Sequence, residues 1–288
     1  MLRRASPILL LLAMLPFLLV MGFYSRFVLT PLVWIYPRWG RPLLNETMRF
    51  WGSSVLRMGV WICGVDVRTS GYTPEPSRSF LVISNHQSII DIVVLVWLFR
   101  VGHIKFVMKK ELEWGIPNIS PATRTARFAF LDRKAGGVAA EAPLRALARA
   151  VREEGTGCVI FPEGTRSRDG NLRTFKAAGT AILCHELDLD VVVVTLDGTW
   201  HAAKPAQMLA NLPGLRIRVH VSEPAPLERF RADPRTAVEQ VRAEMEANLA
   251  EFRSGDEPPP ARASRGSTRR YSFRQCPSTH SPPSTVRW

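Results

Sequence analysis

The sequence predicts an α/β fold in which a mixed, largely parallel sheet is flanked by helices and preceded by an N-terminal membrane-associated helical segment. Short runs rich in β-branched residues alternate with helical stretches after Gly64, which is the pattern of strands joined by helices. The four valines at 191–194 predict a strand that is buried on both faces of the sheet. Two apolar stretches near the N-terminus predict the membrane-associated segment.

The composition limits the class of protein. The chain has 288 residues, of which 46% are hydrophobic and 22% are charged, so a substantial core is available. The formal net charge of +13 favours a polyanionic partner: nucleic acid, an anionic lipid surface or a phosphorylated substrate. The four cysteines are widely scattered and form no CxxC pair, which favours reduced thiols in a cytoplasmic compartment over a disulfide framework or a metal site.

The N-terminal stretch 7–23 is an uncharged run of 17 residues that follows two arginines. As a helix it would be roughly 26 Å long, slightly short of the ~30 Å hydrocarbon core, so a tight span and a shallow hairpin both fit. No A-x-A-like cleavage site follows it, which argues against a removed signal peptide. A second apolar stretch, 27–36, is interrupted by Pro31 and carries Trp34 and Tyr36, residue types that favour the membrane interface. We therefore expect residues 1–63 to anchor the chain to a membrane.

A helical stripe of apolar residues follows between positions 43 and 63. Its members recur at spacings of 4, 3, 4, 3 and 4 residues: Leu44, Met48, Trp51, Val55, Met58 and Ile62. Ordinary core packing and an amphipathic helix resting on the bilayer both explain this spacing.

Residues 64–253 carry the strand and helix signals of the α/β domain. The predicted strands are 65–69, 80–84, 104–108, 128–131, 157–161, 191–196 and 215–221. The predicted helices are 88–99, 137–153, 174–187 and 236–253.

The last segment, 254–288, is dominated by Pro, Ser and Arg. It holds six arginines against two acidic residues and has few large apolar side chains. Such a segment cannot bury enough apolar surface to order itself, so we predict a disordered basic tail that could contact anionic lipid.

The motif NHQSIID, residues 85–91, lies where a predicted strand runs into an apolar helix. With His86 in the turn and Asp91 in the first helical turn, the carboxylate can reach one ring nitrogen, fix the tautomer and leave the other nitrogen to take a proton. Alternatively Ser88 is an N-cap with Asp91 as its partner, and His86 is only a turn residue. The two interpretations are compatible, because the cap would hold the carboxylate in place. The absence of a G-x-S-x-G elbow or an adjacent nucleophile argues against a covalent hydrolase.

A second motif follows the predicted strand 157–161 and reads PEGTRSRDG. Gly164 allows a close approach of the backbone to a ligand. Thr165, Ser167 and the guanidinium of Arg166 could hold a phosphate. The alternative is a solvated turn closed by Asp169 and Gly170.

Two further cations lie just after predicted strands. Arg133 occurs in FLDRK and Lys109 in FVMKKEL. Several cations at strand ends, together with a histidine–aspartate pair, would suit an anionic substrate that carries a hydroxyl group.

The joint occurrence of N-H-x-x-x-x-D, F-x-x-R and F-P-E-G-T-R-S resembles the 1-acylglycerol-3-phosphate acyltransferase family, also called lysophosphatidic acid acyltransferases, within the glycerolipid acyltransferases. The resemblance covers roughly residues 40–225 and implies a glycerolipid acyltransferase-like fold. It implies that His86 acts as general base on the free hydroxyl of a lysophospholipid, oriented by Asp91. The hydroxyl would attack the thioester of acyl-CoA or an acyl carrier protein without an acyl-enzyme.

The same resemblance implies substrate-binding roles for the cationic motifs. Arg133 and Arg166 would bind phosphate, and Glu163, Gly164, Thr165 and Ser167 would shape the acceptor site around Arg166. Lys109 matches a lysine often found in the family, with Lys110 as a neighbouring candidate. No metal or redox cofactor is implied, because the acyl thioester is a co-substrate.

Two departures from the family pattern leave the acceptor open. Val193 stands where a proline is expected, and the glycine after "FK" is displaced to Gly179. Another lysophospholipid, glycerol 3-phosphate and a lyso-aminolipid are therefore alternative acceptors, and a non-catalytic lipid-binding homologue is the alternative from another class.

The expected partners are the lysophospholipid, the acyl thioester, an anionic bilayer and, as one form of donor, acyl carrier protein. The chain shows no helix-turn-helix, finger or RNA-binding signature, so we do not expect nucleic acid binding. The expected location is the cytoplasmic face of a bacterial inner membrane.

Overall fold

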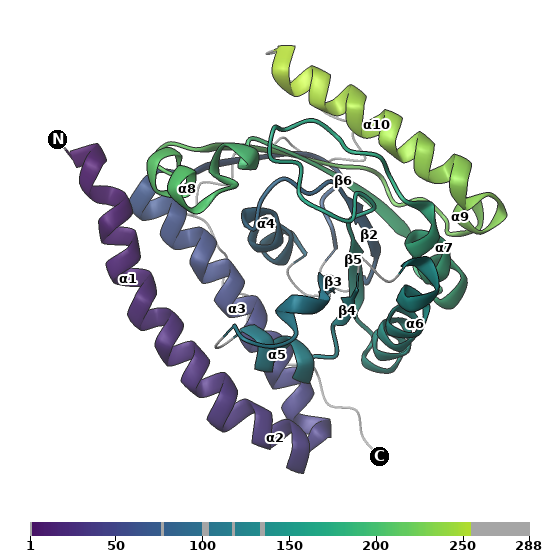
Figure 1. Cartoon of the computed structure of the whole chain (residues 1–288), viewed down its shortest axis with the longest axis horizontal. Coiled ribbons are helices and arrows are strands. Elements are labelled where there is room, and N and C mark those ends of the chain that lie inside the picture. Colours follow the sequence, from purple (N-terminus) through teal and green to yellow (C-terminus); the bar gives the residue numbers. More distant parts are fainter. Residues whose placement is uncertain (1, 76–77, 100–103, 117–118, 133–135, 255–288) are drawn as a thin grey trace, which may run out of the picture.

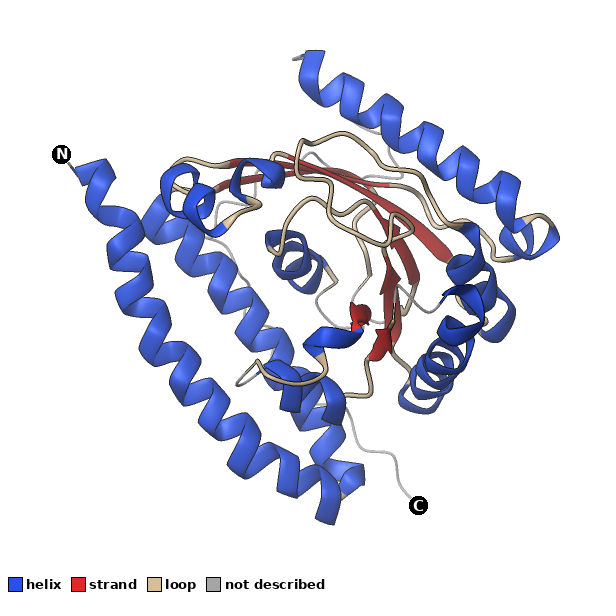
Figure 2. Ribbon diagram, viewed as in Figure 1, coloured by secondary structure: helices blue, strands red, loops and turns tan. Residues whose placement is uncertain are grey.

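A seven-stranded sheet forms the centre of the molecule (Figures 1 and 2). The computed structural model describes residues 2–75, 78–99, 104–116, 119–132 and 136–254. All seven predicted strands are present: β1 (Asp66–Gly71), β2 (Leu81–Ser84), β3 (Ile104–Lys109), β4 (Ala129–Leu131), β5 (Gly157–Ile160), β6 (Val191–Asp197) and β7 (Arg216–Val221). Arg133 and residues 255–288 of the predicted basic tail lie outside the described residues. Ser254, the first residue of the predicted tail, is instead the last residue of the final helix.

The strand order is β1-β7-β6-β2-β5-β3-β4. Strands β6, β2, β5, β3 and β4 are mutually parallel, whereas β7 runs antiparallel to β6 and parallel to β1. The sheet is therefore mixed and largely parallel, as predicted. The carboxyl ends of β6, β2, β5, β3 and β4 meet at one edge, where open α/β sheets bind their ligands.

Alternation along the strands creates a core on each face of the sheet. Val82 packs into one hydrophobic cluster while its neighbours Leu81 and Ile83 pack into the other. All seven residues of β6 are buried, which confirms the prediction from the four valines. Figure 1 shows α4 and α3 on the concave face, with α6, α7 and α10 on the opposite face.

The helices of the α/β domain match the predicted ones closely. They are α4 (Ile90–Leu98), α6 (Gly136–Glu154), α7 (Ala177–Glu186) and α10 (Pro234–Ser254). Three short helices were not predicted, because five to seven residues are too few for a periodic signal: α5 (Ile119–Thr125), α8 (Pro205–Asn211) and α9 (Glu228–Ala232).

The N-terminal helices form a pair beside the sheet (Figure 1). Helix α1 (Leu2–Tyr24) continues through a π-helical turn (Ser25–Leu29) into α2 (Thr30–Ile35), so Pro31 does not interrupt it. The proline occupies the first turn of α2, where a missing N–H is tolerated. Residues Ile8–Ile35 form one helix that is long and apolar enough to cross a membrane, and 17% of its most apolar window is buried. The span is thus longer than the 17-residue run suggested.

Helix α3 (Pro37–Cys63) begins earlier than the predicted stripe and buries a different face. Of the six stripe residues only Leu44 is fully buried, and the buried face centres on Gly52, Ser53, Leu56 and Gly59. The small residues on this face let α4 approach closely. A Cβ at Gly52 would lie 2.7 Å from the side chain of Val96. The partner helix, rather than apolar spacing, therefore decides which face is buried.

A polar cluster around Glu154, at the end of α6, connects α3 to the α/β domain. Its carboxylate accepts hydrogen bonds from Arg41 at 2.8 Å and Asn45 at 3.4 Å, both on α3, and from Lys105 on β3 at 2.7 Å. Burial lowers the pKa of Lys105, although Glu154 beside it favours the charged form. The buried lysine keeps its partners through this cluster and through the Ala126 carbonyl at 2.7 Å.

Candidate active site

The turn between β2 and α4 brings His86 and Asp91 together. β2 ends at Ser84 and α4 begins at Ile90, so His86 precedes the helix and Asp91 lies in its first turn. The Nδ1 atom of His86 is 2.8 Å from Oδ2 of Asp91. The predicted pairing of the two side chains is therefore present.

The Asp91 carboxylate is fully buried and accepts hydrogen bonds at both oxygens. Oδ2 accepts the backbone N–H groups of Gln87 at 2.6 Å and Ser88 at 2.7 Å, in addition to His86 Nδ1. Oδ1 accepts the hydroxyl of Thr199 at 2.5 Å. An ionised carboxylate only accepts, so Nδ1 carries the proton and Nε2 presents a lone pair. No residue in the described ranges hydrogen-bonds Nε2.

The capping interpretation holds for one half of the motif. The bond from the Ser88 N–H to Asp91 is the return arm of a capping box. The other arm is weak, because Ser88 Oγ accepts the N–H of Ile90 only at 3.4 Å. The same hydroxyl donates to the Ala202 carbonyl at 3.3 Å. The cap and the histidine–aspartate pair share one carboxylate.

The imidazole of His86 stacks on the ring of Phe161, with centroids 4.1 Å apart and planes 18° apart. Its side chain is 11% exposed. The Phe161 face and the Asp91 bond together fix the plane and the rotation of the ring, so that Nε2 has one direction.

Glu163 connects the two motifs through the backbone. Oε1 accepts the N–H of His86 at 2.8 Å and Oε2 accepts the N–H of Arg173 at 3.1 Å. Burial raises the pKa of Glu163 to about 7, and the two backbone hydrogen bonds offset only part of this effect. Both of its carboxylate oxygens thus hold the turns in register, a positioning role that the sequence did not predict.

The arginine motif forms a loop over the end of β5. The N–H of Ser167 donates to the His86 carbonyl at 2.7 Å, and Gly164 adopts a φ of +66°, a left-handed conformation that favours glycine. Arg166 is half-buried, and within the described ranges no carboxylate pairs with it. Thr165 is exposed. The loop thus carries the Arg166 guanidinium next to the histidine turn, and no carboxylate of the described residues pairs with it.

Lys109 lies farther along the same edge, at the end of β3. Its Nζ forms an ion pair with Glu111 at 2.7 Å, and its side chain is 45% exposed. The structure therefore does not bring Lys109 into contact with the His86 pair, and Arg133 lies outside the described residues.

Several residues that the sequence did not predict hold the site together. The Asn85 amide exchanges two 2.8 Å hydrogen bonds with the backbone of Leu196, which fastens the turn to β6. Asp197, at the end of β6, accepts Gln87 Nε2 at 3.2 Å and pairs with Arg253 of α10 at 3.1 Å. Asp197 and Thr199 directly follow the predicted strand 191–196, at the carboxyl edge of the sheet. Polar residues just after a predicted parallel strand are the sequence signal that could have identified them.

Comparisons with known proteins found matches over the part of the chain that holds this site. Residues 64–197 match the family model described as "Acyltransferase". The chain is 34% identical over 140 residues to a 1-acyl-sn-glycerol-3-phosphate acyltransferase of Limnanthes douglasii, which covers 49% of this chain and 48% of that protein. It is 27% identical over 145 residues to the protein of the same name from Borreliella burgdorferi, covering 50% and 56% of the two chains. The chain thus spans about half the length of these curated relatives.

A solved structure shares the fold. The crystal structure of the 1-acyl-sn-glycerophosphate (LPA) acyltransferase PlsC from Thermotoga maritima aligns with a TM-score of 0.55 at 22% identity. The alignment covers 82% of this chain and 96% of that chain. At this level of identity the similarity concerns the fold alone.

Replacing Thr199 by valine should slow any reaction in which His86 takes a proton. The change removes the hydroxyl that donates to Asp91 Oδ1 and keeps the side-chain shape. A hydrogen bond to a charged group contributes about 1.5–3 kcal/mol, so kcat should fall roughly 10- to 100-fold with KM little changed. Thr199→Ser keeps the hydroxyl and should retain most of the activity. Equal losses in Thr199→Val and Thr199→Ser would contradict this role.

Glu163 should make stability depend on pH. Because its pKa is raised to about 7, the folded chain binds a proton that the unfolded chain has already lost near the ordinary carboxyl pKa. The stability that protonated Glu163 contributes is complete below the ordinary carboxyl pKa of the unfolded chain. It is lost as pH rises through the folded-state pKa of about 7. The free energy of unfolding of the wild type minus that of Glu163→Gln should fall by roughly 3 kcal/mol across this window. Denaturant titrations at several pH values measure it, and a difference independent of pH would contradict the assignment.

Proposed function

We propose that this chain, whose residues 64–197 form a domain of the acyltransferase family, transfers a fatty acyl group from an acyl thioester to the free hydroxyl of 1-acylglycerol 3-phosphate and gives phosphatidic acid. The observation that carries the proposal is the fixed His86–Asp91 pair, whose Nε2 has no partner among the described residues. The loop that bears Arg166 is bonded to the backbone of the same histidine turn. The relatives named for this activity support the same acceptor.

In the proposed reaction Nε2 of His86 takes the proton of the acceptor hydroxyl as its oxygen attacks the thioester carbonyl. The new C–O bond forms and the carbonyl becomes a tetrahedral oxyanion. Collapse of this intermediate breaks the C–S bond, and the imidazolium returns the proton to the leaving thiolate. Asp91 stabilises the imidazolium between the two steps and does not itself become protonated.

Arg166 is the proposed partner of the acceptor phosphate. A guanidinium binds phosphate oxygens through two parallel hydrogen bonds, and Arg166 has no competing carboxylate among the described residues. Glu163 and Ser167 act through the backbone of His86. They couple the position of the phosphate-binding loop to the position of the base. The reaction as proposed requires no metal or redox cofactor.

We place the chain at a membrane, because both the acceptor and the acyl chain reside there. The helix Ile8–Ile35 is long and apolar enough to span a bilayer, and Trp34, Trp39 and Trp61 are more than 70% exposed as interfacial residues often are. The net charge of +13 would attract anionic lipid. The cytoplasmic face of a bacterial inner membrane is the proposed location.

A panel of acceptors tests the substrate. The purified chain, incubated with labelled acyl-CoA, should acylate 1-acylglycerol 3-phosphate faster than glycerol 3-phosphate, lysophospholipids with larger headgroups or a lyso-aminolipid. His86→Ala should lower kcat by about 10²- to 10⁴-fold, whereas His185→Ala, at an exposed position on α7, should leave it unchanged. Unchanged transfer by His86→Ala would refute the base assignment. If another acceptor is acylated faster, 1-acylglycerol 3-phosphate is not the preferred substrate. If no acceptor is acylated, the chain is better explained as a non-catalytic lipid-binding homologue.

A further inference from the structure

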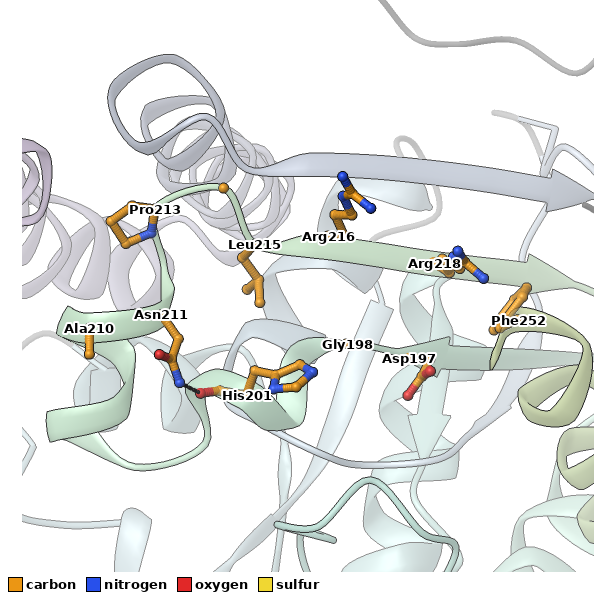
Figure 3. A pocket seen from close by; sticks show the side chains of 11 residues that line it. Asp197, Gly198, His201, Ala210, Asn211, Pro213, Leu215, Arg216, Arg218 and Phe252 are labelled. Atoms are coloured by element: carbon orange, nitrogen blue, oxygen red, sulfur yellow. Dashed lines mark hydrogen bonds between the residues drawn. The ribbon is translucent and has the colours of Figure 1, made fainter. Parts of the chain in front are cut away.

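A cavity of about 510 Å³ lies next to the His86 site on the side of β6 and β7 (Figure 3). Its volume is in the range typical of small-molecule sites. None of the residues that line it belongs to the histidine turn or to the arginine loop. The cavity is lined by Asp197, Gly198, His201, Ala210, Asn211, Pro213, Gly214, Leu215, Arg216, Arg218 and Phe252.

Two arginines of β7 give the cavity its charge. Arg216 and Arg218 are two residues apart on one strand, so they share a face and lie about 7 Å apart along it, while Ile217 between them is buried on the other face. Among the described residues neither guanidinium has an ion pair. The carboxylate of Asp197 in the cavity wall is already neutralised by Arg253 at 3.1 Å. The cavity is therefore suited to a ligand with two separated anionic groups.

His201 gives the cavity wall a flat ring. Figure 3 shows the Asn211 amide turned toward the backbone of His201, where it donates to the carbonyl at 2.6 Å. The ring of His201 stacks on that of Trp200 with centroids 3.7 Å apart, which holds the imidazole flat. Aromatic surfaces of this kind stack readily on the rings of a nucleotide base.

In strand order the cavity lies on the other side of β2 from the start of the arginine loop. The end of that loop reaches the cavity wall, because Arg253, which pairs with Asp197, also donates to the Gly170 carbonyl at 2.6 Å. The arginine loop follows β5 and Lys109 ends β3, both on one side of β2. Strands β6 and β7 lie on the other side of β2. β7 begins at the edge where β6 ends, and Arg218 lies opposite Asp197 in the register of this antiparallel pair. Two strand spacings separate β2 from β7, about 10 Å. Ile217 packs into the same cluster as α4, so Arg216 and Arg218 lie on the opposite face, which α10 covers. A long substrate whose thioester lies at His86 would therefore have to cross this edge of the sheet to reach the two arginines.

We propose that this cavity binds the phosphorylated nucleotide end of the acyl donor, coenzyme A. The two arginines would take two of its phosphate groups, and the His201 ring would stack on the base. The inference rests on the proposed acyl transfer, since it assigns the donor side of the same site. It leaves the phosphate of the acceptor to Arg166 on the opposite side.

Direct binding tests the proposal without requiring catalysis. Coenzyme A is titrated into the full chain in detergent micelles, and the same titration is made with the double variant Arg216→Gln/Arg218→Gln. Affinity should fall about tenfold or more, because each charge-assisted bond contributes more than a neutral one. The matched control is Arg149→Gln/Arg235→Gln, which removes the same charge from exposed positions on α6 and α10 and should leave the affinity unchanged. Arg216→Lys/Arg218→Lys should recover part of it.

Kinetics then separate the donor from the acceptor. The double glutamine variant should raise KM for acyl-CoA about tenfold or more and leave KM for 1-acylglycerol 3-phosphate unchanged. Unchanged coenzyme A affinity would overturn the proposal, as would a loss confined to the lysophospholipid. If the chain acylates none of the acceptors, the proposed function fails, whereas the coenzyme A titration still decides whether the cavity binds the nucleotide.

Discussion

The buried carboxylate of Asp91 is the constraint on which the site depends. A fully buried charge is tolerated only with hydrogen-bond donors around it, and its four donors come from two distant segments: the turn 86–88 and Thr199 beyond β6. Satisfying this one group therefore fixes the turn, the end of β6 and the His86 tautomer together. The fold and the proposed chemistry share a single electrostatic requirement.

The parallel sheet places the histidine turn between the two proposed substrate sites. Because β2 is central and its neighbours end at the same edge, His86 lies between the loop after β5 and the cavity beside β7. Glu163 on one side and Asp197 on the other are each bonded to the histidine turn. Arg253 extends the connection to the Gly170 carbonyl at 2.6 Å, so helix α10 supports both sides.

The strands, the four main helices of the α/β domain and the His86–Asp91 pair follow from local sequence, because β-branched runs and a strand-to-helix turn are local signals. Thr199 was not predicted, because it meets Asp91 across 108 residues, and no periodicity encodes that contact. Apolar spacing left open whether the stripe of α3 packs in the core or faces the bilayer. The most buried face is set by the approach of α4, which requires the small residue Gly52.

The protonation state of His86 tests the account most directly. Nitrogen-15 NMR of the histidine-labelled chain near neutral pH, assigned with His86→Gln, reports which ring nitrogen carries the proton. We expect a protonated Nδ1 and an unprotonated Nε2 for His86, and a shift toward the other tautomer in Asp91→Asn, whose amide can donate to Nδ1. A proton on Nε2 in the wild type, with no change in Asp91→Asn, would contradict it.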